Sequence, residues 1–139
     1  MTPNKPLTIM IADDDADDRE VLRFLFTKND RFELINCFES GIDVIKEIMV
    51  ENNLPDILLI DMYMPMLTGA EIIKKLEESK IGVNMYKFVV SSTINSAAES
   101  KYIENNKVKF IKKPVSLKEI NDLPGIILDH LHYDNNTKV

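Results

Sequence analysis

One aspartate stands where a buried strand is predicted to end. Asp61 follows the four apolar residues Ile57 to Ile60, which have the length and hydrophobicity of a strand buried on both faces of a parallel sheet. Pro65 prevents an immediate helix, and Thr68 with Glu71 three residues later forms a capping box that starts one. Asp61 is therefore predicted at the mouth of a strand, loop and helix, where ligands bind in open α/β sheets.

Other polar residues follow three further apolar runs. They are Asp13 and Asp14 after residues 7–12, Ser91 near the end of residues 88–92, and Lys113 after residues 108–112. In a parallel sheet every strand presents its carboxyl end at the same edge, so these residues are predicted to be neighbours. The second predicted strand, residues 32–38, carries nothing comparable. Strand order 2-1-3-4-5 would explain this, because it puts the second strand at the margin of the sheet.

The chemistry of this group of residues points to a metal and a phosphoryl group. Three carboxylates at roughly 4 to 6 Å repel each other by roughly a few kcal/mol per pair at an effective dielectric near 20. A divalent cation offsets that repulsion, and ligation by carboxylates, a backbone carbonyl and waters is the pattern of Mg²⁺. Lys113 could add a second positive charge toward a phosphoryl group, and Ser91 a hydroxyl donor. Asp61 could then attack phosphorus as a nucleophile and become an acyl phosphate.

Helical patterns alternate with the strands. Predicted helices cover residues 16–29, 40–53, 68–79, 96–105 and a last segment opened by Ser116 and Glu119. The apolar stripes expected to face the core are Val21, Leu22, Leu25 and Phe26 in the first helix and Ile42, Ile45, Ile48 and Met49 in the second. Five alternations predict an α/β protein with the flavodoxin-like (βα)5 doubly wound parallel sheet.

Three local features refine this prediction. Asp15 is interpreted as the cap of the first helix, with Asp17, Asp18 and Glu20 filling the first turn, where the helix dipole favours negative charge. A break or kink is expected in the last helix at Leu123-Pro124-Gly125, because an interior proline followed by glycine costs several kcal/mol. The polar tail, residues 133–139, is expected to fray.

Composition limits the class of protein. The chain has 139 residues, of which 45% are hydrophobic, and this length and composition predict a single domain. Its net charge of −6 argues against a nucleic-acid partner. Cys37 is the only cysteine, so an internal disulfide is impossible and a reducing compartment is favoured. The sequence shows neither a signal-peptide pattern nor an apolar run of membrane-spanning length, which predicts a cytoplasmic protein without a membrane partner.

Four motifs resemble the response-regulator receiver domain of two-component signalling. They are Ala12-Asp13-Asp14-Asp15, Asp61 with Met64-Pro65 and Gly69, Val90-Ser91-Ser92, and Phe110-Ile111-Lys112-Lys113-Pro114. The spacings also fit the family, because Ser91 stands 30 residues after Asp61 and Lys113 stands 22 after Ser91. The resemblance covers about residues 7–132 and leaves no room for an effector domain. It therefore implies a single receiver domain over residues 1–139, of the stand-alone, CheY-like type.

The resemblance implies a role for each acidic residue of the site. Asp61 would accept a phosphoryl group from a phosphohistidine on a sensor histidine kinase or phosphotransfer protein. Asp13 and Asp14 would hold Mg²⁺, with Asp14 favoured as the direct ligand, and the backbone carbonyl of Tyr63 would add another ligand. The protein would then have little turnover of its own, at most a slow self-dephosphorylation.

The remaining family residues would sense the phosphoryl group. Lys113 would pair with the phosphoryl oxygens, and its peptide bond to Pro114 would be cis. Ser91, with hydroxyls one and two residues further along at Ser92 and Thr93, would swing toward the phosphoryl group. Phe110 would turn inward behind it and change the face made by the fourth helix, fifth strand and fifth helix. The downstream protein target that reads this face is not named by the sequence.

Three alternatives come from other classes of protein. A haloacid-dehalogenase-type phosphatase resembles this site but carries a second aspartate two residues after the nucleophile, where this chain has Tyr63. A flavodoxin-type nucleotide binder needs a Gly/Ser/Thr loop after the first strand, and the aspartate cluster would repel its phosphate. A receiver-like scaffold that binds partners without phosphorylation stays open, although intact Asp61 and Lys113 argue against it.

Overall fold

The computed structural model describes residues 5–92 and 107–137, with side chains as far as residue 131. Five parallel strands form one sheet in the order β2-β1-β3-β4-β5, which confirms the predicted topology. The strands are β1 (Leu7–Ala12), β2 (Phe32–Phe38), β3 (Ile57–Asp61), β4 (Tyr86–Ser91) and β5 (Val108–Lys112). Strand β4 begins two residues earlier than predicted, because Tyr86 pairs with Ile57 at the start of β3.

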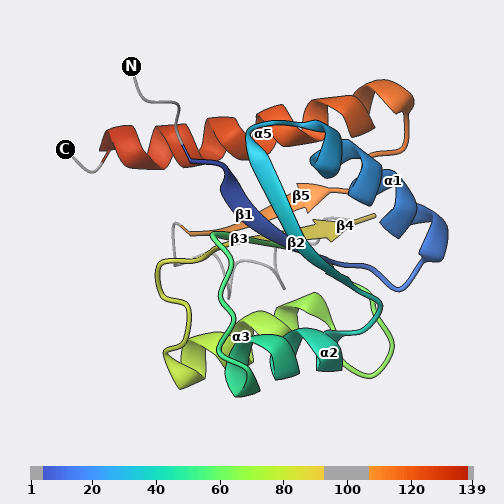
Figure 1. Cartoon of the computed structure of the whole chain (residues 1–139). Coiled ribbons are helices and arrows are strands. Elements are labelled where there is room, and N and C mark those ends of the chain that lie inside the picture. The colour runs from blue at the N-terminus through green and yellow to red at the C-terminus, as the bar shows by residue number, and fades with distance from the viewer. Residues whose placement is uncertain (1–4, 93–106, 138–139) are drawn as a thin grey trace.

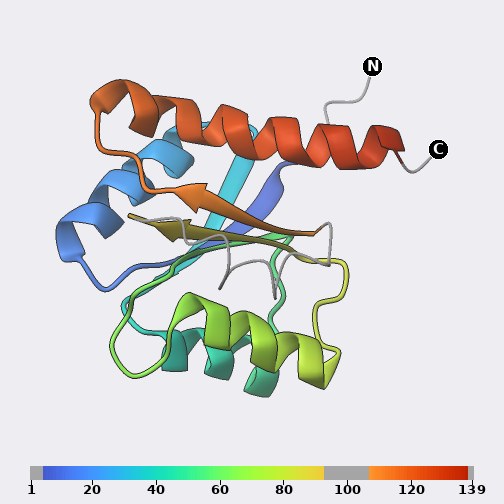
Figure 2. The same cartoon turned by 180° about the vertical axis from the view of Figure 1, so that it is seen from behind.

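Helices cover both faces of the sheet, as the doubly wound fold requires (Figure 1). Helices α1 (Ala16–Lys28) and α5 (Leu117–Thr137) lie on one face. The other face carries α2 (Gly41–Ile45), its π-helical continuation η1 (Lys46–Val50) and α3 (Gly69–Ser79), as the view from behind also shows (Figure 2). The helix expected over residues 96–105, with its Ser96 and Glu99 capping box, lies outside the described residues.

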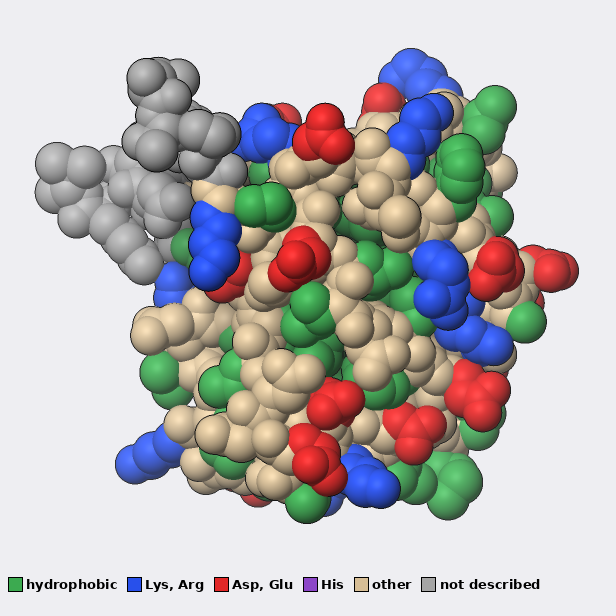
Figure 3. All heavy atoms as spheres, viewed as in Figure 1, with side chains coloured by type: hydrophobic (Ala, Val, Ile, Leu, Met, Phe, Trp, Pro, Cys, Tyr) green, Lys and Arg blue, Asp and Glu red, His purple; other side chains and the backbone are tan. Residues whose placement is uncertain are grey.

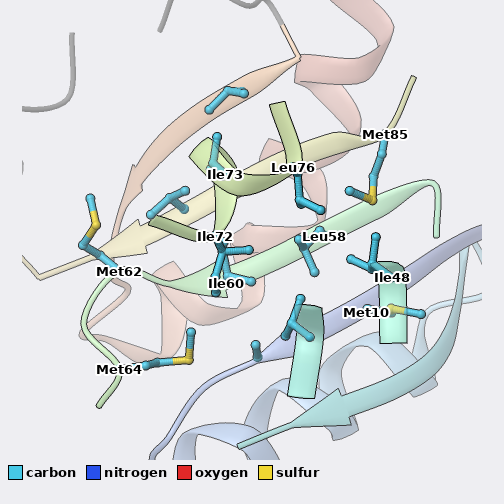
Figure 4. Close-up of a cluster of buried hydrophobic side chains, with 14 residues drawn as sticks. Met10, Ile48, Leu58, Ile60, Met62, Met64, Ile72, Ile73, Leu76 and Met85 are labelled. Atoms are coloured by element: carbon cyan, nitrogen blue, oxygen red, sulfur yellow. The ribbon is translucent and has the colours of Figure 1, made fainter. Parts of the chain in front are cut away.

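The larger apolar cluster lies between the sheet and helices α2, η1 and α3. Ile72 and Leu76 of α3 lie against Leu58 and Ile60 of β3, the central strand (Figure 4). All four side chains are 0% exposed. Full burial of such a side chain is worth about 1.5 to 3 kcal/mol. The strand that ends at the candidate site is therefore firmly held on this face.

The second apolar cluster packs α1 and α5 on the opposite face of the sheet. It contains Phe26 of α1, Phe88 of β4, and Leu123 of α5. The predicted stripe on α1 is only partly right, because Phe26 is buried whereas Val21 is 43% exposed. The end of α1 nearest the candidate site therefore packs less tightly than its far end.

The second predicted helix differs from expectation in its length and at one predicted core residue. It ends at Val50 rather than residue 53, and Asn52 just beyond it has a left-handed backbone with a φ of 56°. Ile42, expected in the core, is 48% exposed, while Val44 is fully buried. The other three predicted core residues agree with the structure, because Ile48 is fully buried and Ile45 and Met49 are partly buried against the same apolar cluster.

A break or kink is expected in the last helix, and the break is wrong, because α5 continues through Pro124 and Gly125. Pro124 lacks the N–H that would bond the Ile120 carbonyl, at a cost of about 3 kcal/mol. Leu123 and Ile127 are buried four residues apart on the sheet side of α5. Their burial offsets that cost and holds the helix together.

The segment expected to fray, residues 133–139, has helical backbone as far as Thr137, and fraying itself stays a prediction. Once a helix has formed, each further residue adds one backbone hydrogen bond at low entropic cost. This favours continuation of α5 over an abrupt end at residue 132.

The surface of the molecule mixes charges of both signs. Figure 3 shows acidic and basic side chains interspersed among hydrophobic ones on the face seen in Figure 1. Exposed ion pairs three or four residues apart are Arg23 with Glu20, Lys74 with Glu78, and Lys118 with Asp122. Such pairs contribute about 0 to 1 kcal/mol each. Packing of the two apolar clusters therefore matters more to stability than these pairs.

Replacement of Gly69 by alanine should destabilise the fold at the end of the central strand. A methyl group there would lie 2.9 Å from the Asp61 carbonyl oxygen and 3.2 Å from the Met62 Cα atom. Because both are backbone atoms, β3 or α3 must shift, and the free energy of unfolding should fall by about 1 to 3 kcal/mol. Urea denaturation measures this, with Gly125→Ala as the matched control, since nothing lies within 4 Å of a methyl group at Gly125. Equal effects of the two substitutions would contradict the prediction.

Candidate functional site

The strand register brings the predicted residues to one edge of the sheet. Asp61, the last residue of β3, pairs with Val90 of β4, and Ala12 at the end of β1 pairs with Ile60. Asp13 and Asp14 follow Ala12 directly, so they lie beside the end of β3. Carboxylate oxygens of the three aspartates lie within 4.8 Å of one another. The sequence-based expectation that they converge agrees with this geometry.

Backbone contacts hold Asp13 in place. Its carboxylate accepts a hydrogen bond from the Asp15 N–H at 2.9 Å, and its carbonyl accepts one from Arg19 Nη1 at 2.8 Å. Its own N–H donates to the Phe38 carbonyl of β2 at 3.0 Å. Asp13 is only 3% exposed, whereas Asp14 is exposed. Asp14 is thus the more accessible of the two carboxylates, which suits a direct metal ligand.

Burial makes the ionised form of Asp61 costly. Loss of solvent contact, together with the charge of Asp13, raises the pKa of Asp61 from 3.8 to about 6, although Lys113 and a hydrogen bond with the Tyr63 backbone act in the opposite direction. Burial also raises the pKa of Asp13. Ionisation of both Asp13 and Asp61 is therefore unfavourable without a counter-charge. A bound cation would stabilise their ionised forms.

The raised pKa of Asp61 predicts a pH dependence of stability. Between about pH 4 and pH 6 the folded protein holds a proton on Asp61 that the unfolded chain releases, so the free energy of unfolding falls as the pH rises through this window. Without divalent cations, Asp61→Asn should therefore be more stable than the wild type at pH 7, by on the order of 1 to 2 kcal/mol. The difference should vanish as the pH falls below about 4.

Urea denaturation of the wild type and of Asp61→Asn across pH 4 to 8, with EDTA present, measures this difference in the free energy of unfolding. Addition of Mg²⁺ should narrow it at pH 7, because a bound cation stabilises the ionised aspartates of the wild type. A variant no more stable than the wild type at pH 7 would contradict the assigned direction of the pKa shift.

Lys113 reaches the site from the loop after β5. Its Nζ atom lies 3.9 Å from Asp61 Oδ2 and 3.8 Å from Asp13 Oδ2. The shortest of its three ion-pair distances, 2.8 Å, joins Nζ to Asp18 Oδ2 of α1. Burial by itself would lower the pKa of Lys113, but the hydrogen bond to Asp18 and the three neighbouring carboxylates outweigh it and raise the pKa. Lys113 is therefore a permanent positive charge beside Asp61.

Asp18 is the residue of the site that sequence reasoning missed. Its sequence pattern, shared with Asp17 and Glu20, predicts only the dipole-complementing first turn of α1. Asp15 does cap this helix, since its carboxylate accepts a hydrogen bond from the Asp18 N–H at 2.9 Å. The position of Asp18 could have indicated its role. The helix that follows β1 begins at the edge of the sheet where β1 ends, so the first turn of this helix lies beside the site.

Ser91 and Phe110 lie where the sequence places them in β4 and β5. Ser91 is fully buried, and its carbonyl accepts a hydrogen bond from the Lys113 N–H at 2.7 Å. Phe110 pairs with Val89 and is half-buried against the apolar cluster beneath α3. Ser92 is exposed at the end of β4, and Thr93 lies outside the described residues.

The Lys113-Pro114 peptide bond is trans, which corrects the cis bond that the resemblance implies, because the described residues contain no cis bond. A trans bond before proline is favoured by about 0.5 to 1 kcal/mol. In this arrangement the Lys113 N–H still continues the hydrogen bonding between β4 and β5.

A small cavity of about 70 Å³ opens beside Asp61 and Lys113. Its walls between α1 and α5 are apolar and include Val21, Ile120 and Leu123. These side chains offer the carboxylate no hydrogen-bond donor on that flank, which agrees with burial as the largest cause of its raised pKa.

Fold and site together define a class, namely small doubly wound α/β proteins with an acidic site at the carboxyl edge of the central strands. The sequence matches the family model of the response regulator receiver domain over residues 9–123, which is most of the chain. The protein therefore belongs to the response regulator receiver domain family, and the predicted resemblance is confirmed.

The curated relatives described here are longer than this chain. It is 28% identical over 125 residues to a protein-glutamate methylesterase/protein-glutamine glutaminase of Halalkalibacterium halodurans, covering 84% of this chain and 34% of that protein. It is 36% identical over 70 residues to the transcriptional regulatory protein YdfI of Bacillus subtilis, covering 50% of this chain and 32% of that protein. The chain thus spans about a third of the length of these curated relatives.

Solved structures share the fold. The response regulator domain of Thermotoga maritima CheB superposes with a TM-score of 0.73 at 21% identity, covering 92% of this chain and 96% of that one. The signal receiver domain of NarL from Mycobacterium tuberculosis gives the same TM-score at 18% identity, over 91% and 96% of the two chains. In the part of the chain that the structure describes, no helix is both long and apolar enough to cross a bilayer.

Proposed function

We propose that this chain is a phosphoacceptor that takes a phosphoryl group on Asp61 with the help of Mg²⁺ and thereby switches a protein-interaction surface. The observation that carries the proposal is the position of Asp61. It ends the central strand within 4.8 Å of carboxylate oxygens of Asp13 and Asp14, and 3.9 Å from Lys113 Nζ. Membership of the receiver family supports the same role.

The residues present fit Mg²⁺, whose ligands are oxygen atoms. Asp13, Asp14 and Asp61 would hold it, together with the backbone carbonyl of Tyr63. The fit rests on the crowding of the three carboxylates and on the raised pKa values of Asp13 and Asp61. When bound, Mg²⁺ would supply positive charge that shields the incoming phosphoryl oxygens from the carboxylates.

Transfer from a phosphohistidine would proceed by attack of an Asp61 carboxylate oxygen on phosphorus. A phosphorus–oxygen bond forms, and the phosphorus–nitrogen bond breaks. The imidazole nitrogen keeps the electron pair of that bond and takes a proton from water. With a pKa of about 6, Asp61 is mostly ionised at neutral pH and can act as the nucleophile. Lys113 would stabilise the charge on the phosphoryl oxygens.

The phosphoryl group would be read out through Ser91 and Phe110. Ser91 lies at the carboxyl end of β4, beside the end of β3 that carries Asp61. Phe110 is only half-buried and can therefore gain contacts by turning inward. We propose that a cytoplasmic sensor histidine kinase or phosphotransfer protein delivers the group, and that an unidentified protein target recognises the switched face.

Incubation with Mg²⁺ and acetyl phosphate tests the proposal, with mass spectrometry as the readout. A single phosphoryl adduct on Asp61 that does not form in EDTA is the expected result. Rapid multiple turnover of phosphomonoesters would favour the haloacid-dehalogenase-type phosphatase instead. Absence of both adduct and turnover would favour a receiver-like scaffold that binds partners without phosphorylation.

Tyr63 should slow loss of the phosphoryl group. Tyr63 is 57% exposed and stands two residues after Asp61. The resemblance to the receiver family implies that positions 63 and 93 flank the path of the hydrolytic water. Removal of this bulk in Tyr63→Ala should speed dephosphorylation severalfold, measured as decay of the adduct after the phosphodonor is removed. Met66→Ala, at an 86% exposed position of the same loop, is the control. An unchanged decay rate in Tyr63→Ala would disprove this role.

A further inference from the structure

Among the ion pairs of the Lys113 ammonium given above, the shortest is with Asp18, a residue outside the motifs of the site. The 2.8 Å between Lys113 Nζ and Asp18 Oδ2 is a hydrogen-bond distance, whereas 3.9 Å to Asp61 Oδ2 is not. A charge-assisted bond of this length is stronger than an ordinary hydrogen bond. In the unphosphorylated protein the Lys113 ammonium is therefore hydrogen-bonded to Asp18 of α1 and not to Asp61.

Asp18 cannot easily follow Lys113 toward the phosphoacceptor. Its N–H is bound to the capping carboxylate of Asp15 at 2.9 Å, which fixes the first turn of α1. The next residue, Arg19, anchors that turn to the Asp13 carbonyl through its Nη1 atom at 2.8 Å. The pair is also only partly exposed, with side-chain exposures of 28% for Lys113 and 41% for Asp18, so solvent screens it incompletely.

We propose that Asp18 is a positioning residue that competes with the phosphoryl group for Lys113. The inference rests on the proposed function of Asp61. The Lys113 ammonium would have two competing anionic partners, the Asp18 carboxylate and the phosphoryl group. A closer contact with one weakens its contact with the other. Asp18 therefore weakens the hold of the site on the phosphoryl group and shortens the lifetime of the phosphorylated state. By reciprocity, phosphorylation loosens the link between Lys113 and α1.

The test compares Asp18→Asn, which removes the charge at nearly constant shape, with Asp17→Asn. Asp17 is an exposed residue of the same turn, and among the described residues the ion pairs of Lys113 are with Asp13, Asp18 and Asp61. The probe is beryllium trifluoride with Mg²⁺, a stable mimic of the phosphoryl group, titrated by NMR. Asp18→Asn should bind it about three- to fivefold more tightly than the wild type, the size that a partly exposed ion pair supports. Asp18→Glu, which keeps the charge, should restore most of the wild-type affinity.

A second readout tests the ion pair without any ligand. In protein labelled at the lysine ε-carbons, Asp18→Asn should shift the Lys113 resonance, and Asp17→Asn should leave it in place. The lifetime of the acetyl-phosphate adduct should lengthen in Asp18→Asn by a factor similar to the gain in affinity.

Equal affinities in the Asp18→Asn and Asp17→Asn variants would overturn the inference, because the effect would then be one of general charge. Weaker binding in Asp18→Asn would also overturn it, since Asp18 would then be helping Lys113 to meet the phosphoryl group. A wild-type protein that takes neither beryllium trifluoride nor a phosphoryl group would instead refute the proposed function, and this inference with it.

Discussion

Asp61→Asn should abolish phosphoryl uptake from acetyl phosphate while leaving the protein folded. The asparagine amide has nearly the same shape as the carboxylate but cannot attack phosphorus, so the rate of adduct formation should fall by at least about a thousandfold. The fold should tolerate the change, because burial already disfavours the ionised carboxylate. Mass spectrometry after incubation with Mg²⁺ and acetyl phosphate measures the loss.

Asp56→Asn is the matched control for this experiment. Asp56 immediately precedes β3, at the opposite end from Asp61, where its carboxylate accepts hydrogen bonds from the Thr8 N–H at 2.9 Å and the Thr8 hydroxyl at 3.1 Å. It should therefore form the adduct as the wild type does. An adduct that persisted in Asp61→Asn would place the phosphoacceptor elsewhere and contradict the proposed function.

Phe88→Ala should produce the largest loss of stability of the substitutions considered. Phe88 lies in the middle of β4 and is 0% exposed. The centroid of its ring lies 5.4 Å from the centroid of the His130 ring, in an edge-to-face arrangement. The lost burial and the cavity left behind should lower the free energy of unfolding by about 3 to 5 kcal/mol. That is a large part of the roughly 5 to 15 kcal/mol that holds an ordinary domain folded. Urea denaturation followed by circular dichroism measures it.

Phe24→Ala makes the same chemical change at an exposed position. Phe24 of α1 is 68% exposed, with the Lys28 ammonium 5.4 Å from its ring centre. Its loss should cost less than about 1 kcal/mol, since exposed substitutions change stability little. Similar losses in both variants would mean that β4 is not part of a packed core.

The sequence by itself determined the sheet and the convergence of the acidic residues. Apolar runs such as Ile57 to Ile60 are local signals, and they mark the strands without knowledge of their neighbours. Parallel strands then bring their carboxyl ends to one edge as a matter of geometry. Asp13 and Asp61, 48 residues apart in the sequence, are therefore predictable as neighbours, and the structure places their carboxylates together.

Only the tertiary structure decided features that depend on packing between elements. Whether α5 continues through Pro124 depends on the burial of Leu123 and Ile127 against the sheet, which offsets a local cost of about 3 kcal/mol. The partner of Lys113 depends on where α1 lies over the edge of the sheet, and ångström differences in that position select Asp18 rather than Asp61. Local patterns in the sequence do not predict the continuity of α5 or the partner of Lys113. Both depend on contacts between segments that are far apart in the chain.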